Sequence, residues 1–297
     1  MPKVSVLMPV YNTKEEYLRE TIESILNQTF TDFEFIILND GSTDGNVERV
    51  VKSYTDNRIR YIRQDNQGIA RSRNRLMKLA QGEYLALTDH DDISHVDRFA
   101  KQVRVLDEYP NINIVSAWYN VFPANRIVKL VENPRLFDFL YGNCQILHPC
   151  AMMRKSFLEQ YNLEYKLDYP TAEDYELWTR AVRYTDMYNI QEVLFEYRDH
   201  DTQQSKLSAD IQKAGAARAS QNLLDFITLD ADMQKQIHKW FNPKTQRKEK
   251  LLEKIFSLRN SHDKTHKIVK IFGMTLRFKR GGKTSNTEKN KEQGYVI

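Results

Sequence analysis

The chain has 297 residues, of which 28% are charged, and its 44 Lys and Arg residues against 40 Asp and Glu residues give a net charge of +4. It contains only two cysteines, which excludes a disulfide-built secreted scaffold and fits a reducing cytoplasm. No apolar run approaches the ~20 residues of a membrane span, and the N-terminus lacks the apolar region of a signal peptide. We therefore expect a cytoplasmic protein with one large α/β domain and an appendage.

The N-terminal segment has the pattern of a strand, a helix and a second strand. The segment of residues 3–12 contains an apolar strand that we expect to stop at Pro9. The segment of residues 33–44 contains another, which ends in an acidic turn. Between them, apolar residues recur at helical spacing, namely Leu18, Ile22, Ile25 and Leu26. Ligands in open α/β sheets bind at the carboxyl ends of the strands, so Asn12, Asp40 and Asp89 should line one crevice.

The alternation continues as in a doubly wound domain. We expect strands over residues 58–63, 83–88, 113–122 and 126–131, and helices over residues 68–80 and 96–109. Pro110 and Asn111 break the chain after the second helix, and Pro123 separates the last two strands. The sequence from there to about residue 149 is less regular.

The strand of residues 83–88 leads into a turn that carries Asp89, Asp91 and Asp92. Carboxylate oxygens are the ligands that Mg²⁺ and Mn²⁺ prefer, and such ions usually complete their shell with waters and substrate phosphates. The turn is therefore suited to holding a divalent cation against a diphosphate. The alternative is that these carboxylates only cap a helix that begins near Ser94.

An arginine-rich segment, residues 65–75, follows the strand expected over residues 58–63. Gly68 marks a turn into a helix on which Arg71 and Arg75 share a face, while Arg73 points elsewhere. Arg71 could neutralise a diphosphate. The alternative, a solvated basic helix face, is stronger for Arg73 and Arg75 than for Arg71.

A further helix is expected to begin between Thr171 and Asp174, because Leu177, Trp178 and Ala181 follow at core-facing spacing. Glu173 and Asp174 stand at its start. An ordinary capping role is one interpretation of both carboxylates.

Four sequence motifs, PVYN, NDGSTDG, DNQGIARSRNRL and LTDHDD, occur in this order, and together they resemble the family 2 glycosyltransferases of the GT-A fold. The likeness covers roughly residues 1–205. It implies a Rossmann-like, doubly wound mixed sheet with flanking helices, and an enzyme that moves a sugar from a nucleotide diphosphate donor with inversion at the anomeric carbon. It also implies Mn²⁺ or Mg²⁺ as the cofactor.

The resemblance assigns roles to individual residues. It places Pro9, Val10, Tyr11 and Asn12 beside the nucleoside, makes Asp40 an acceptor from the base, and adds Asn66, Gly68 and Arg71 to the donor site. Asp89 and Asp91 form the DxD pair at the ribose, metal and diphosphate. His90 between them replaces the small residue common in the family, so it either points away or narrows the choice of donor.

The same resemblance extends to the second half of the chain. The sequence AEDYELWTRA matches the family's catalytic-base motif, with Asp174 as the general base and Glu173 as the next candidate. His200, in a YRxH-like segment, is a candidate contact of the metal or phosphate, although a structural role stays open. For His148 the structural role is the stronger interpretation.

The sequence after residue 205 is expected to form a helical, basic extension to residue 280, with helices over 209–229 and 232–258 and a disordered tail over 281–297. Basic residues outnumber acidic ones from Lys239 onward, so residues 239–280 could bind an anionic membrane surface at the inner face of the cell membrane. The alternative is an edge strand, because Met274, Leu276 and Phe278 alternate.

We expect a metal-dependent inverting transferase of a hexosyl or N-acetylhexosaminyl group, with a UDP-sugar preferred. The acceptor would be a hydroxyl of a glycan or lipid-linked molecule in capsule, lipopolysaccharide or similar biosynthesis. A catalytically silent nucleotide-sugar-binding scaffold is the alternative. A haloacid-dehalogenase-like phosphatase is weaker, since Asp92 stands where that family has Thr or Val. Cys144 and Cys150 offer too few ligands for a zinc site, and no recognised module supports a nucleic-acid partner.

Overall fold

A computed structural model describes the chain except for residues 202, 227–255, 261–265, 272–273 and 280–297. The chain divides into two compact units, Met1–Ser220 and Gln221–Ile297, and each is described by itself. Within the described residues, no helix combines the length and the apolar character needed to cross a membrane.

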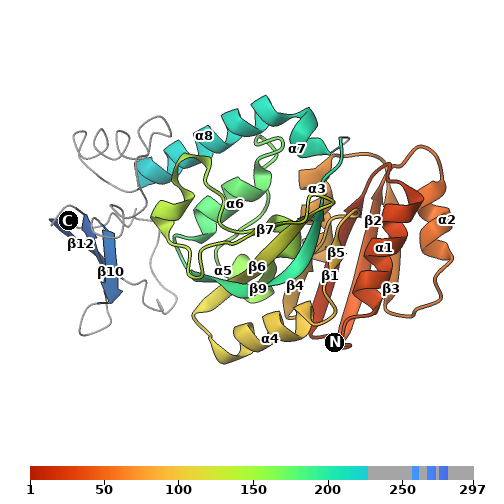
Figure 1. The fold of residues 1–297 in the computed structure, drawn as a ribbon, viewed down its shortest axis with the longest axis horizontal. Helices are drawn as coiled ribbons and strands as arrows, with labels where there is room; N and C mark the ends of the chain where they lie inside the picture. The colour runs from red at the N-terminus through yellow and green to blue at the C-terminus, as the bar shows by residue number, and fades with distance from the viewer. Residues whose placement is uncertain (202, 227–255, 261–265, 272–273, 280–297) are drawn as a thin grey trace. The chain divides into compact units, whose positions relative to one another are not determined.

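Parallel strands form the N-terminal part of the sheet in the first unit (Figure 1). They lie in the order β3 (Ile59–Gln64), β2 (Phe33–Asp40), β1 (Val4–Val10) and β4 (Tyr84–Leu87). Because the carboxyl ends of β1, β2 and β4 meet at one edge, the polar turns that follow them are brought together.

The expectation that the first strand stops at Pro9 is wrong, because β1 continues to Val10. Thr88 N donates to Leu7 O at 3.2 Å, so the backbone of Leu7, and two residues later that of Pro9, faces β4. The pairing of β1 with β4 ends at Leu7 opposite Leu87. Pro9 therefore lies beyond the end of that ladder, where its missing N–H removes no hydrogen bond.

The remaining strands make the sheet mixed. After β4 the order continues with β8 (Met152–Arg154), β6 (Ile112–Phe122), β9 (Asp186–Arg198) and β5 (Ile93–Ser94), while β7 (Arg126–Val128) pairs with β6. β8 is antiparallel to both β4 and β6, whereas β6 and β9 are parallel. This arrangement confirms the doubly wound mixed sheet expected from the resemblance.

Helices cover both faces of the sheet. On one face, the apolar side chains of β1 and β2 share a core with α1 (Glu15–Leu26), α2 (Asn46–Lys52) and α4 (Arg98–Glu108). The expected helical residues Leu18, Ile22 and Ile25 of α1 are fully buried in it. α3 (Ile69–Leu79) packs against β1 and β2 outside this core cluster, on the opposite face, through the buried Leu76.

Shorter elements complete the first unit. They are η1 (Leu136–Gly142), η2 (His148–Cys150), α5 (Lys155–Gln160), α6 (Glu173–Ala181) and α7 (Gln204–Leu207). α6 is the helix expected from the Glu-Asp motif, and Leu177, Trp178 and Ala181 are buried as predicted. α8 (Ala209–Phe226) accounts for most of the helix expected over residues 209–229.

The second unit corrects the expectation of an all-helical extension. β10 (Phe256–Asn260), β11 (His266–Ile271) and β12 (Met274–Lys279) form a three-stranded antiparallel sheet. The alternation of Met274, Leu276 and Phe278 thus indicated a strand correctly, whereas the helix expected to reach residue 258 is wrong at its end. The rest of that helix and the tail over 281–297 lie outside the described residues.

Candidate active site

The turns after β1 and β2 are tied together by Asn12. This residue has a positive φ of 43°, and its side-chain Oδ1 accepts from Thr43 N at 2.9 Å. Its own backbone N donates to Ser42 Oγ at 3.0 Å. Tyr11 is 44% exposed, whereas Pro9 and Val10 are buried, so the exposed surface of the PVYN motif consists of Tyr11 and Asn12.

Asp40 fixes the entry into α3. Its side chain is buried, and its two oxygens accept from the backbone N–H groups of Gln67 and Gly68, both at 2.9 Å. Gln64 Nε2 donates to the same carboxylate at 2.6 Å. A carboxylate has about four lone-pair sites, so Asp40 keeps capacity for one more donor.

Gly41 allows this entry to lie close to β2. It has a φ of +77°, and a Cβ at this position would lie 2.6 Å from the backbone N of Asn66. A side chain would therefore be strained by its backbone conformation and would also collide with the next loop. The exposed Asn66 and the N-cap residue Gly68 are held at this edge of the sheet as a result.

The turn after β4 separates its carboxylates into two groups. Asp91 Oδ2 lies 2.9 Å from His200 Nε2, and Asp89 Oδ1 accepts from Arg73 Nη2 at 3.3 Å. Asp92 is only 1% exposed and points inward, where its Oδ1 accepts from Arg198 N at 2.8 Å. Asp92 thus joins this turn to the end of β9, while Asp89 and Asp91 are left for a ligand.

The carboxylates of this turn influence one another. Burial raises the pKa of Asp89, and the charge of Asp91 adds to the rise, while Arg73 opposes it. Burial also raises the pKa of Asp92 well above its ordinary value, with further contributions from Asp91 and Asp89. A cation at the turn would relieve this repulsion.

The donor atoms of Asp89, Asp91 and His200 fit Mn²⁺ or Mg²⁺ that is held jointly by protein and substrate. Within the described part of the chain, no group of three or more His, Cys, Asp or Glu side chains is arranged as a complete metal cage. An ion bound through one or two carboxylates and completed by phosphates needs no such cage. His90 lies in the same turn, and its Nδ1 is buried without a hydrogen-bond partner.

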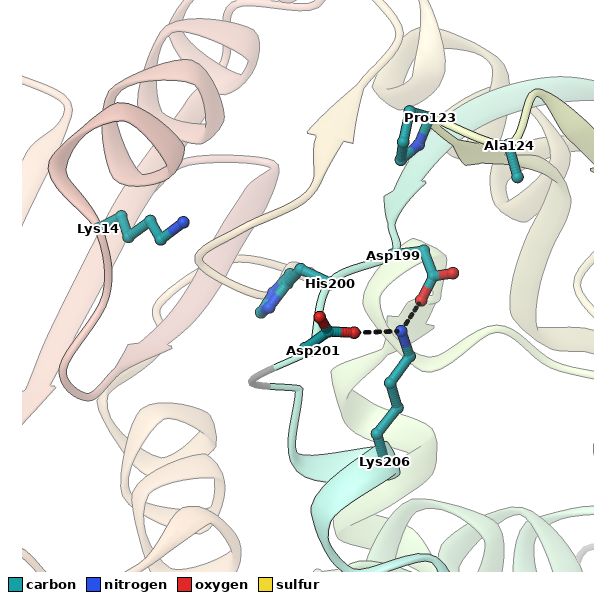
Figure 2. Close-up of a pocket in the computed structure, with 7 residues that line it drawn as sticks. All are labelled: Lys14, Pro123, Ala124, Asp199, His200, Asp201 and Lys206. Atoms are coloured by element: carbon teal, nitrogen blue, oxygen red, sulfur yellow. Dashed lines mark ion pairs between the residues drawn. The ribbon is translucent and has the colours of Figure 1, made fainter.

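His200 also lines a cavity of about 610 Å³ (Figure 2). Its lining residues are Lys14, Pro123, Ala124, Asp199, His200, Asp201 and Lys206. The ammonium group of Lys206 lies 2.6 Å from Asp199 Oδ1 and 3.7 Å from Asp201 Oδ1. His200 therefore contacts Asp91 and also lines a polar cavity that carries both signs of charge.

Asp174 stands at the first turn of α6, next to the buried Glu173. Its Oδ1 accepts from Tyr175 N at 2.6 Å. Burial, reinforced by the charge of Glu173, raises the pKa of Asp174 to about 6, against the opposing effect of Arg73. The preceding Thr171 has a positive φ of 61°, a strained conformation for a β-branched residue of the kind that often accompanies functional sites. The carboxyl is poised to accept a proton near neutral pH.

Arg73 is the site residue that the sequence interpretation placed wrongly. A solvated helix face was the favoured interpretation for it, yet its Nη1 lies 2.5 Å from Glu173 Oε1 and its side chain is only 11% exposed. Arg71 is the exposed residue, with Nη1 3.4 Å from Gln67 O. The sequence did contain a signal that Arg73 is buried, because Arg73 stands three residues before the buried Leu76 and so shares its side of α3.

His148 has the structural role that was favoured for it. Its side chain is buried, and its Nε2 lies 2.9 Å from Tyr165 OH. Burial lowers the pKa of His148, so the imidazole is neutral. Cys150 is also buried, and the Cys144 thiol donates to Ile146 O at 3.1 Å.

Comparison with known proteins agrees with this geometry. The family model described as glycosyl transferase family 2 matches residues 5–161. An uncharacterized glycosyltransferase of Methanocaldococcus jannaschii is 32% identical over 207 residues, which are 66% of this chain and 71% of that protein. The chain belongs to glycosyl transferase family 2.

Solved structures of low sequence identity show that this family 2 chain has the GT-A fold. Staphylococcus aureus TarS 1-349, in complex with UDP-GlcNAc, has a TM-score of 0.64 at 18% identity over 82% of this chain and 74% of that one. The mannosyltransferase PcManGT from Pyrobaculum calidifontis, in complex with GDP-Man and Mn²⁺, has a TM-score of 0.51 at 16% identity, covering 81% of both chains.

One alternative considered for the sequence does not survive these comparisons. The strand that precedes Asp89 is the fourth of a family 2 domain, so the haloacid-dehalogenase-like phosphatase is excluded. Matches to several longer glycosyltransferases, from Rickettsia species, span 33% to 35% of those proteins.

Proposed function

We propose that the chain is an inverting, metal-dependent glycosyltransferase that uses a nucleotide diphosphate sugar, with a UDP-sugar preferred. The observation that carries the proposal is the connection of Asp89, at the end of β4, to Glu173 and Asp174, at the start of α6, through Arg73. It brings a donor-binding carboxylate beside a carboxyl with a pKa of about 6. TarS binds UDP-GlcNAc in its complex, which favours a hexosyl or N-acetylhexosaminyl donor.

Asp174 acts as the general base in this proposal. With a pKa of about 6 it is ionised at neutral pH and still basic enough to take the proton from an acceptor hydroxyl as that oxygen attacks. Attack from the face opposite the leaving group inverts the anomeric centre. General-base assistance of this kind typically contributes about 10²–10⁴-fold to the rate.

Asp89 and Asp91 hold the donor side. Mn²⁺ or Mg²⁺, when bound there with the diphosphate, supplies positive charge that stabilises the leaving nucleoside diphosphate. His200 orients Asp91 through their 2.9 Å contact. Tyr11, Asn12, Asn66, Gly68 and Arg71 border the nucleotide at the same edge of the sheet, and Asp40 reaches the base with its remaining acceptor capacity.

The acceptor is proposed to be a hydroxyl of a growing glycan or of a lipid-linked molecule, in cell-surface polysaccharide biosynthesis. The basic segment 239–280, much of which lies outside the described residues, would bring the enzyme to the inner face of the cell membrane. Flotation with anionic liposomes tests this part. Equal binding after deletion from Lys267 would exclude that role.

The test of the function is nucleoside diphosphate release from a panel of UDP-, GDP- and other nucleotide sugars with Mn²⁺. We expect release from one donor by the wild type and its loss in Asp91→Asn. An Asp174→Asn protein should bind the donor and lose turnover. Absence of release from every donor, with no metal-dependent nucleotide binding by calorimetry, would favour the silent scaffold instead.

A further inference from the structure

We infer that Arg73 is a positioning residue that joins the donor carboxylate Asp89 to the base-bearing start of α6 through Glu173. The inference rests on the proposed function only in taking Asp174 as the base. Arg73 belongs to α3, Asp89 follows β4, and Glu173 opens α6. One side chain thus bridges three elements that are distant in sequence.

The geometry uses the two ends of the guanidinium fork separately. Nη1 lies 2.5 Å from Glu173 Oε1, and Nη2 lies 3.3 Å from Asp89 Oδ1. A guanidinium presents several donors in a rigid plane, so it can hold two carboxylates in a fixed relation, whereas a lysine ammonium is a single point charge on a flexible stem. The distance between the donor carboxylate and α6 is therefore set by Arg73.

Neighbouring contacts hold the stem of Arg73 in place. The next residue, Asn74, exchanges hydrogen bonds with the backbone of Tyr165, from Asn74 Nδ2 to Tyr165 O and from Tyr165 N to Asn74 Oδ1, both at 2.8 Å. The guanidinium lies 5.6 Å from the Tyr165 ring centroid, and Tyr165 OH meets His148 Nε2 at 2.9 Å. The neutral, buried His148 therefore contacts Tyr165, which in turn packs against Arg73.

The ion pair between Arg73 and Glu173 does not satisfy all the hydrogen-bonding atoms of the two side chains. Arg73 Nε and Glu173 Oε2 are both buried without a hydrogen-bond partner, and each unsatisfied polar atom costs about 1–3 kcal/mol. A buried ion pair is in general weak support for stability. Retaining this pair at that cost fits a role in the site better than a role in holding the fold.

Arg73 also places a positive charge beside the carboxylates of Asp89, Glu173 and Asp174. The groups that face Asp174 are Glu173, Arg73 and Asp89, and the neutral Cys144 and Tyr165 lie on the same side. Removing Arg73 would leave Asp174 beside two negative charges, so it would keep its proton to higher pH. Removing the charge of Glu173 would have the opposite effect.

The test follows the Asp174 carboxyl directly, by ¹³C NMR titration of protein labelled at the aspartate carboxyl carbon, with the signal assigned by its absence in Asp174→Asn. We expect Arg73→Gln to raise the midpoint and Glu173→Gln to lower it, each by about 1 unit or more. Arg73→Lys should keep the midpoint near that of the wild type, because it keeps the charge. Arg104→Gln, an exposed arginine of α4, is the control and should leave the midpoint unchanged.

Turnover measured on the same proteins distinguishes the positioning role of Arg73 from the effect of its charge. Arg73→Lys should lose at least about tenfold in kcat although its midpoint is normal, because one ammonium cannot hold both carboxylates. An unmoved midpoint in folded Arg73→Gln, or full kcat in Arg73→Lys, would overturn the inference. If Arg73→Gln does not fold, an unmoved midpoint in Glu173→Gln overturns it instead.

Failure of the proposed function would look different. Near-normal turnover by Asp174→Asn would remove the base and, with it, any catalytic meaning of Arg73. An inactive Asp174→Asn together with unmoved midpoints in Arg73→Gln and Glu173→Gln would overturn the inference about Arg73 alone.

Discussion

The raised pKa of Asp174 predicts that this residue lowers the stability of the protein at neutral pH. An unfolded aspartate ionises near 3.8, whereas burial beside Glu173 raises the pKa of Asp174 to about 6. Above pH 6 the folded protein must therefore keep a charge in a place that disfavours it. The difference of about two units corresponds to about 3 kcal/mol, which is an upper bound because the carboxyl is partly exposed.

Asp174→Asn removes that charge and keeps an oxygen to accept from Tyr175 N. We expect it to raise the free energy of unfolding by about 1–3 kcal/mol at pH 8. The gain should shrink between pH 6 and pH 4, because the wild-type carboxyl then becomes protonated in the folded state and, at the lower limit, in the unfolded state as well. Urea unfolding followed by tryptophan fluorescence at several pH values measures the gain in the free energy of unfolding and its dependence on pH.

Asp168→Asn, in the segment just before α6, is the matched control. Asp168 is exposed, and its hydrogen bond to Arg218 lowers its pKa, so its ionised form is favoured by folding rather than penalised. The control should show no gain at pH 8. The reasoning is refuted if Asp174→Asn unfolds at the wild-type urea concentration at pH 8, or if its gain is as large at pH 4.

Further predictions concern the turns around the site. The value of kcat/KM should fall about tenfold per unit as the pH drops below about 6, since Asp174 must be ionised to accept a proton; a flat profile to pH 5 would contradict that role. Asp92→Asn should raise the urea midpoint at pH 8, because burial disfavours the charge of Asp92. It should keep turnover within about tenfold of the wild type, because Asp92 is bonded to Arg198 N. Loss of metal-dependent turnover would indicate that Asp92 is a ligand of the metal. Gly41→Ala should lower the free energy of unfolding by about 2–4 kcal/mol and Gly45→Ala by about 1–2 kcal/mol. Both glycines have a positive φ, but only at Gly41 would an added Cβ meet a backbone atom. Equal losses of the two variants in urea unfolding would exclude the close approach at Gly41.

The parts of the site that follow strands could be predicted from the sequence. Asn12, Asp40 and Asp89 each stand two residues after the last aliphatic residue of a strand, and parallel strands present their carboxyl ends at one edge. The Glu-Asp pair of α6 was equally accessible, because helical spacing of buried residues follows it. In each case a local pattern sufficed.

The parts decided by distant contacts could not be predicted in this way. Asp92 is distinguished from Asp89 and Asp91 only by Arg198, which arrives from the far end of the chain on β9. Pro9 remains inside a strand because β4 is short. The side chain of Arg73 is drawn to Glu173, and neither the length of α6 nor the charge pattern of α3 specifies that pairing.

The position of β9 has a consequence for how the protein acquires its activity during synthesis. The parallel strands β1 to β4 can associate once the first part of the chain has emerged from the ribosome, but β9 must pair with β6 across a long intervening segment. Contacts between sequence-distant residues form slowly, because the entropy of closing the loop is lost first. Arg198 and His200, which hold the acidic turn, arrive with this late strand. A nascent chain therefore completes its nucleotide-binding edge before its acidic turn is held, so catalytic competence should appear only at the end of folding.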